Sequence, residues 1–138
     1  MEFYQMPLFN KILVRDIEKA EKWYRHTLGF QSVFKFRNES NEVIMNHLRL
    51  KKYQDIMLIQ SDDFSSGNGF FINLLVDDIE TIANSISEKY VLQPLEQMPW
   101  NAMEMTIVDS DGYQITLTES NISDNDFEKL MNSISQKY

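Results

Sequence analysis

Residues 9–18 read FNKILVRDIE and residues 71–80 read FINLLVDDIE, so one pattern occurs twice in the chain, 62 positions apart (71 minus 9). In each copy an apolar, strand-like run leads to an aspartate that can cap a helix, and apolar residues then recur at helical spacing. The apolar stripes of the two predicted helices are Ile17, Ala20, Tyr24 and Leu28 in the first, and Ile79, Ile82, Ala83 and Ile86 in the second. The chain therefore contains an internal repeat. We expect the helix of each copy to cover one face of a sheet with its apolar stripe.

Three strand patterns follow each predicted helix. They cover residues 29–37, 43–50 and 55–60 in the first half, and residues 91–95, 103–109 and 113–119 in the second. A polar, Gly/Ser-rich stretch at residues 61–69 joins the halves. Behind an acidic first turn, an apolar stripe predicts a last helix over about residues 123–137, which we expect to dock on an apolar surface; the stripe is Phe127, Leu130, Met131 and Ile134.

Length and composition indicate one globular domain over residues 1–138, with modules at about 7–60 and 69–119. The net charge of −8 makes nucleic acid an unfavourable partner and favours cationic ligands. No apolar run is long enough to cross a membrane, and the N-terminal stretch lacks the features of a signal peptide, so we expect a cytoplasmic protein. With 0 Cys, disulfides, thiol catalysis and thiolate metal sites are excluded.

A module with its helix on one sheet face leaves the other face bare, so we expect the two modules to pair and curl their bare faces around a cleft. Three signatures accompany the repeat: VRDIE at residues 14–18 leading to Trp23-Tyr24 and Leu28-Gly29-Phe30; VDDI at residues 76–79; and DSDGY at residues 109–113. Together they resemble the vicinal oxygen chelate superfamily, which includes glyoxalase I, extradiol dioxygenases and bleomycin resistance proteins.

This resemblance covers roughly residues 7–119. It implies an α+β fold of two βαβββ modules around a U-shaped groove, with the C-terminal helix as an addition, and it implies a homodimer. Enzymes of the superfamily hold a divalent metal ion with His, Glu or Gln from the first and last strands of each module. The corresponding positions here are Phe9, Met57, Phe71 and Thr116. None of these side chains replaces an imidazole or carboxylate ligand, and of their neighbours only Gln60 and Gln114 could be ligands, so we predict no metal, no cofactor and no catalytic residue.

Residues 96–105, EQMPWNAMEM, resemble the Pro-Trp-Gly…Arg-Glu-Phe segment of bleomycin resistance proteins, with Asn101 in place of Gly and Met103 in place of Arg. Those relatives sequester a large cationic, aromatic drug without a catalytic metal. The resemblance thus implies a small-molecule binding protein, of the type that confers antibiotic resistance, for an aromatic or cationic ligand. The predicted groove residues are Phe9, His47, Met57, Phe71, Trp100, Glu104 and Thr116.

Two other hypotheses remain open at this stage. One is a metal-dependent lyase or dioxygenase of the same superfamily, which would contain a bound divalent ion. The other is a dimeric scaffold whose aromatic side chains fill the groove as core. The two histidines do not decide between them, because we expect His26 on the solvent side of the first helix and His47 inside a strand that lines the groove.

Overall fold

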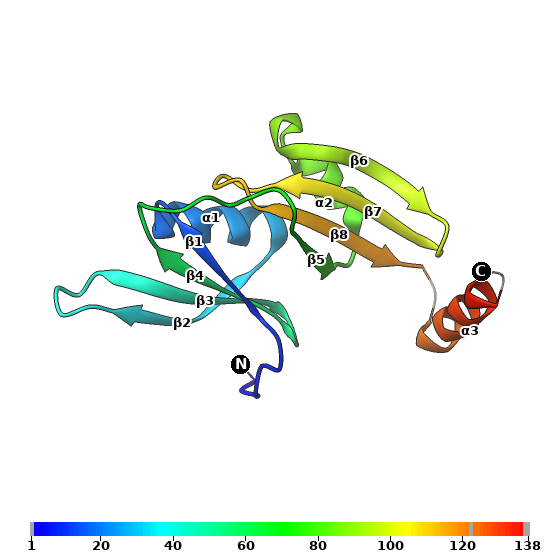
Figure 1. The fold of residues 1–138 in the computed structure, drawn as a ribbon, viewed down its shortest axis with the longest axis horizontal. Coiled ribbons are helices and arrows are strands. Elements are labelled where there is room, and N and C mark those ends of the chain that lie inside the picture. Colours follow the sequence, from blue (N-terminus) through cyan, green and yellow to red (C-terminus); the bar gives the residue numbers. More distant parts are fainter. Residues whose placement is uncertain (1, 122, 137–138) are drawn as a thin grey trace. The chain divides into compact units, whose positions relative to one another are not determined.

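A computed structural model describes residues 2–121 and 123–136 (Figure 1). The chain divides into two units, one built from residues up to 69 together with 109–113, and one from residues 70–108 and from 114 onward. Each unit contains one four-stranded sheet with its own helix. The α+β fold of two βαβββ modules and a C-terminal helix is therefore confirmed.

The first unit contains five elements: β1 (Asn10–Val14), α1 (Ile17–Leu28), β2 (Gln31–Arg37), β3 (Val43–Lys51) and β4 (Gln54–Gln60). The sheet order is β1-β4-β3-β2, and only the β1–β4 pair is parallel. The helix α1 covers one face of this sheet (Figure 1), and the predicted stripe of α1 is buried beneath it. Burial of that stripe holds the unit together, because apolar burial is the largest favourable contribution to folding.

Both ends of α1 are fixed by local chemistry. Asp16 accepts a hydrogen bond from the backbone N–H of Lys19 at 3.2 Å, as an N-cap residue should. Gly29 ends the helix with φ of 84°, a conformation that a residue with a Cβ rarely adopts. Gln60 adds a further cap, since its Oε1 accepts from the N–H of Ile17 at 2.9 Å and its Nε2 donates to the carbonyl of Arg15.

The second unit contains the remaining elements: β5 (Phe71–Leu75), α2 (Ile79–Ser85), the 3-10 helix η1 (Glu88–Tyr90), β6 (Val91–Met98), β7 (Ala102–Val108), β8 (Gln114–Ser120) and α3 (Asp124–Ser135). The sheet order is β5-β8-β7-β6, the same arrangement as in the first unit, again with one parallel pair. The repeat found in the sequence is thus a repeat of topology.

The helix α2 is shorter than its sequence pattern predicts. It has seven residues against twelve in α1, and of its predicted stripe only Ile79 is buried. Asp78 at its start has φ of 50° and makes no side-chain cap, while Ile86 already lies past the last helical residue. The second predicted helix is thus present, but three of its four stripe residues are not buried and the last of them, Ile86, lies just outside the helix.

The strand boundaries differ from prediction mainly at β6, which runs to Met98 rather than ending at residue 95. Pro94 lies inside it, where the register with β7 shifts between Gln93 and Glu96. Proline is tolerated there because β6 is the edge strand of the sheet. The extension places Glu96 in register with Glu104 of β7.

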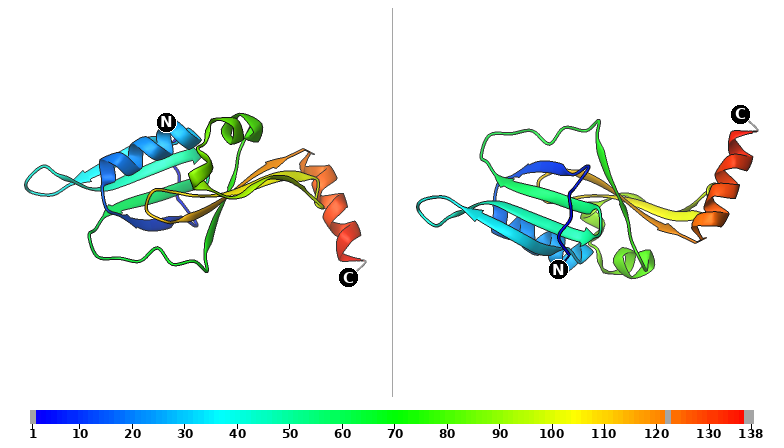
Figure 2. Two further views of the ribbon diagram at one scale, coloured as in Figure 1. Left: turned by 90° about the horizontal axis from the view of Figure 1, so that it is seen from above. Right: turned by 90° about the horizontal axis from the view of Figure 1, so that it is seen from below.

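The helix α3 follows β8 at the end of the second unit (Figure 2). Ser123 caps it by accepting a hydrogen bond from the N–H of Asp126 at 3.2 Å. No described residue of α3 is buried, and Phe127 and Met131 are 40% and 41% exposed. The expected docking of this stripe on an apolar surface is therefore not seen within the described part of the chain. Among the described residues, no helix is long and apolar enough to cross a membrane.

Candidate functional site

Each sheet has one face opposite its helix, which we call its open face. In the first unit Asn46 of β3 donates a hydrogen bond to Glu21 of α1 at 3.0 Å, so its side chain lies on the helix side of the sheet. Successive side chains of a strand point to opposite faces, and His47 therefore lies on the open face. Met57 is its register partner on β4. Two of the predicted groove residues, His47 and Met57, are therefore neighbours, and Phe9 precedes β1 half-buried at the adjoining edge.

His47 belongs to a polar network that sequence reasoning missed. Its Nε2 lies 2.6 Å from Oδ2 of Asp55, whose side chain is 1% exposed. Arg49 donates to the same carboxylate from Nε at 3.1 Å and from Nη2 at 2.9 Å, and the hydroxyl of Tyr4 donates at 2.8 Å. Asp55 thus has three side-chain partners, so its charge is compensated within the unit.

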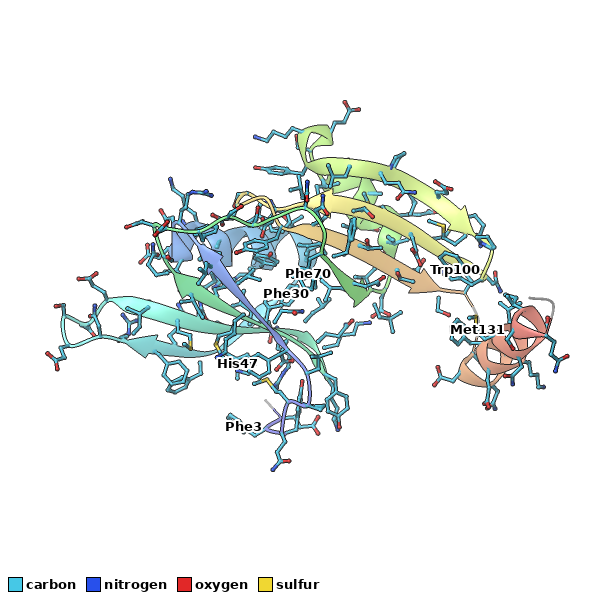
Figure 3. The ribbon with its side chains drawn as sticks, viewed as in Figure 1. Phe3, Phe30, His47, Phe70, Trp100 and Met131 are labelled. Atoms are coloured by element: carbon cyan, nitrogen blue, oxygen red, sulfur yellow. The ribbon has the colours of Figure 1, made fainter. Side chains whose placement is uncertain are left out.

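The same network holds the N-terminal segment on the first unit. The guanidinium of Arg49 stacks 4.1 Å above the ring of Tyr4 and donates to the carbonyl of Glu2 at 2.5 Å. Figure 3 shows His47 beside this segment, which also carries Phe3. Burial acts to raise the pKa of Asp55, but the hydrogen bonds from Arg49, His47 and Tyr4 outweigh it, and the pKa is lowered.

The DSDGY signature also has a structural role in the first unit. Oδ2 of Asp109 accepts from the hydroxyl of buried Tyr24 at 2.5 Å, and Oδ1 accepts from the backbone N–H groups of Asp111 and Tyr113. The hydroxyl of Tyr113 in turn donates to the carbonyl of Leu13 at 2.8 Å. Burial raises the pKa of Asp109, against the opposing effect of these hydrogen bonds. This motif fastens the turn to α1 and β1.

The predicted residues of the second unit lie on its open face. Phe71 of β5 is 54% exposed, and Thr116 of β8 shares a hydrogen bond with Thr106 at 2.9 Å. Indole Nε1 of Trp100 donates to Oε2 of Glu104 at 2.8 Å. Trp100 lies in the turn between β6 and β7 (Figure 3). Trp100 and Glu104, which the sequence suggested separately as groove residues, are thus in direct contact.

A cavity of about 370 Å³ is lined by this Trp100–Glu104 pair together with other residues of the unit. The strands contribute Asn73, Leu75, Ala102, Glu104, Thr118 and Ser120 to its lining. Trp100 lines it from the turn, and Asp124 and Phe127 line it from α3. Trp100 and Glu104 were predicted from the sequence, but the two residues of α3 were not; their only signals were the acidic first turn of the last helix for Asp124 and its apolar stripe for Phe127.

The charges in and beside this cavity are negative. Glu96 of β6 and Glu104 of β7 lie directly opposite each other. Two like charges in this position destabilise a sheet. Among the described residues, neither carboxylate takes part in an ion pair; the amide of Gln93 donates to Glu96 at 3.3 Å. No Lys or Arg is among the described residues that line the cavity. A bound cation would therefore relieve an uncompensated charge.

The four positions that correspond to metal ligands in the enzymes do not fit a divalent ion. They hold phenyl rings at Phe9 and Phe71, a thioether at Met57 and a hydroxyl at Thr116. Of the two neighbouring amides, Gln60 is bonded to the start of α1, and Oε1 of Gln114 is buried without a partner. Within the described part of the chain, no three His, Asp or Glu side chains form a metal-binding group.

Comparison with known proteins gives one family match and many structural ones. Residues 7–117 match the model of the Glyoxalase/Bleomycin resistance protein/Dioxygenase superfamily. A member of that superfamily from Sphaerobacter thermophilus is 29% identical, with a TM-score of 0.63 over 81% of this chain and 94% of that one. No curated protein matches the sequence.

Two further solved structures share the fold. The glyoxalase / bleomycin resistance protein of Catenulispora acidiphila is 22% identical, with a TM-score of 0.60 over 83% of this chain and 98% of that one. TioX from Micromonospora is 16% identical, with a TM-score of 0.65 over 81% and 96%. At these identities the likeness concerns the fold alone.

Proposed function

The chain belongs to the glyoxalase/bleomycin resistance protein/dioxygenase superfamily, whose members bind small molecules, and from this premise we propose that it is a metal-free binding protein for a flat, cationic aromatic molecule. The observation that carries the proposal is the contact between Trp100 and Glu104 at the wall of the 370 Å³ cavity. An indole offers a flat surface for stacking, and a carboxylate beside it attracts a positive charge.

The size and lining of the cavity support this proposal. Ligand pockets usually have volumes of about 300–1,000 Å³ and combine apolar walls with a few polar groups. Leu75, Trp100 and Phe127 supply apolar surface here, and Glu104 and Asp124 supply negative charge. Sequestration needs no further chemistry, since tight binding alone removes a toxic compound from solution.

The alternative of a metal-dependent lyase or dioxygenase finds no support in the donor set at Phe9, Met57, Phe71 and Thr116. The alternative of a dimeric scaffold with a filled groove requires Phe71 and Trp100 to be buried as core; in the single chain they are 54% and 37% exposed. A homodimer remains part of the proposal on the strength of the family resemblance, and sedimentation of the purified protein tests it.

A pair of dyes matched in ring system but opposite in charge tests the function. Pyronin Y and fluorescein share a xanthene ring system but carry opposite charges at neutral pH. We expect pyronin Y to raise the melting temperature and fluorescein to have no effect; at a dye concentration 100 times Kd the stabilisation is about 2.7 kcal/mol. Divalent ions and chelators should leave the melting temperature unchanged.

The Glu104→Gln variant connects binding to the proposed site. Loss of its charge should weaken pyronin Y binding about tenfold, or roughly 1.4 kcal/mol. Glu88→Gln is the matched control, because it removes the same charge from an exposed position in η1 outside the cavity. Equal binding of both dyes, or a stoichiometric metal ion in the purified protein, would overturn the proposal.

A further inference from the structure

The cavity of the second unit is lined partly by residues in or next to the region that matches the family model and partly by residues well beyond it. Its strand residues lie in or next to the region that matches the family model, which ends at residue 117. Asp124 and Phe127 belong to α3, which begins at Asp124, beyond that region. One wall of the cavity is therefore not accounted for by the family match.

The helix α3 contributes surface that its own unit does not cover. Phe127 and Met131 lie one turn apart and are almost equally exposed, at 40% and 41%. Only Phe127 lines the cavity. The helix itself is fixed locally, by the Ser123 cap and by an acidic first turn, so it presents Phe127 without requiring burial of its stripe.

The chemistry of this wall matches that of the strand wall. Phe127 supplies a second aromatic ring to a cavity that already holds Trp100, and Asp124 supplies a second carboxylate to one that already holds Glu104. The N-terminus of a helix repels cations, but Asp124 and Asp126 place two negative charges in its first turn. The same ligand class, a flat organic cation, thus suits both walls.

We propose that α3 is a specificity-determining part of the binding site, in which Phe127 provides a stacking surface and Asp124 a second negative charge for the flat aromatic cation held at Trp100 and Glu104. This inference rests on the proposed function and extends it from the strands of the module to the added helix. A ligand that contacts both walls would connect α3 to the sheet. Packing alone does not do so, because no described residue of α3 is buried.

The test is calorimetric titration of the full chain with pyronin Y. Phe127→Ala should weaken binding at least fivefold, because it removes an aromatic surface from the cavity. Met131→Ala should stay within twofold of the unmodified protein, since it truncates an equally exposed apolar side chain of the same helix outside the cavity. Helix content by circular dichroism verifies that α3 persists in both variants.

A second pair of variants tests the charge. Asp124→Asn should weaken pyronin Y binding about threefold or more, whereas Asp126→Asn should change it less than twofold, because Asp126 does not line the cavity. Both substitutions remove one charge from the first turn of α3, so a general field effect would weaken binding equally in the two variants.

The outcomes separate this inference from the proposed function. If Glu104→Gln weakens binding while Phe127→Ala behaves like Met131→Ala, the strand site stands and the role of α3 is overturned. If the unmodified protein fails to bind pyronin Y, or binds fluorescein equally well, the proposed function fails and this inference fails with it.

Discussion

The open faces of the two units differ in how they treat charge, although the units share one topology. In the first unit the buried carboxylate of Asp55 is bonded to Arg49, His47 and Tyr4. In the second unit the carboxylates of Glu96 and Glu104 face each other, and the ion pairs of the described residues include neither. A repeated fold thus presents one face whose buried carboxylate is paired and one whose two opposed carboxylates lie outside the ion pairs of the described residues.

The helices of the two units also differ, in length, capping and burial. The helix α1 has an aspartate N-cap, a glycine C-cap and a buried stripe, whereas α2 has seven residues and no side-chain cap. The two tryptophans report on the units separately, because Trp23 lies in α1 and Trp100 in the β6–β7 turn. In a Trp100→Phe background, the remaining Trp23 therefore reports unfolding of the first unit. In a Trp23→Phe background, the remaining Trp100 reports unfolding of the second unit.

The largest expected effect is that of Asp55→Ala in the first unit. This substitution leaves the guanidinium of Arg49 without its buried carboxylate, and breaking such a pair costs about 3–5 kcal/mol of unfolding free energy. Urea unfolding monitored by Trp23 measures it. Glu104→Ala, which removes a carboxylate outside any ion pair of the described residues, should change stability by less than about 1 kcal/mol. A similar loss in both variants would erase the contrast between the two faces.

Acid should weaken the first unit through the same carboxylate. The pKa of Asp55 is lower in the folded protein than its unfolded value of about 3.9, so its stabilisation is present above that pH and is lost as the pH falls through the folded pKa. Asp109 acts in the opposite sense, because its folded pKa is raised. Urea unfolding of Asp55→Asn between pH 7 and pH 3 should show a smaller acid-induced loss than the unmodified protein, since Asn does not titrate. An equal loss would assign the acid sensitivity to other groups.

A smaller effect is expected at the C-cap of α1. Gly29→Ala forces a Cβ into a backbone with φ of 84° and should cost about 1 kcal/mol, although no atom lies within 4 Å of the added carbon. Gly69→Ala is the control, because that glycine has equal space and no positive φ. Thermal unfolding of the two variants measures the difference, and equal melting temperatures would show that the cap does not stabilise the helix.

The smallest expected effect is a gain in the second unit. Glu96→Gln removes the like-charge opposition with Glu104 and should raise the unfolding free energy by about 0.2–1 kcal/mol, as followed by Trp100 fluorescence. The gain should shrink at high salt, because salt screens exposed charges. A loss of stability on this substitution would mean that Glu96 is already compensated in solution.

Much of this fold could be predicted from local patterns. The two helices, the strand alternation and the βαβββ repeat follow from apolar spacing that neighbouring residues carry. Trp100 and Glu104 were both named as groove residues, through the resemblance of residues 96–105 to a segment of bleomycin resistance proteins, but their hydrogen bond was not predicted. The length of α2 could not be read in the same way, because its apolar spacing continues past the point where the backbone stops being helical.

The sequence by itself determined the repeat, the aspartate N-cap of α1, the family, and the lack of metal-ligating side chains at the four corresponding positions. Only the tertiary structure decided that Asp55 gathers Tyr4, His47 and Arg49, that Glu96 opposes Glu104, and that Phe127 of α3 lines the cavity. The reason is that these contacts depend on the register between strands, which a bulge such as the one at Pro94 resets, and on the course of the chain after a strand ends. Neither quantity is encoded in the spacing of residues along a single element.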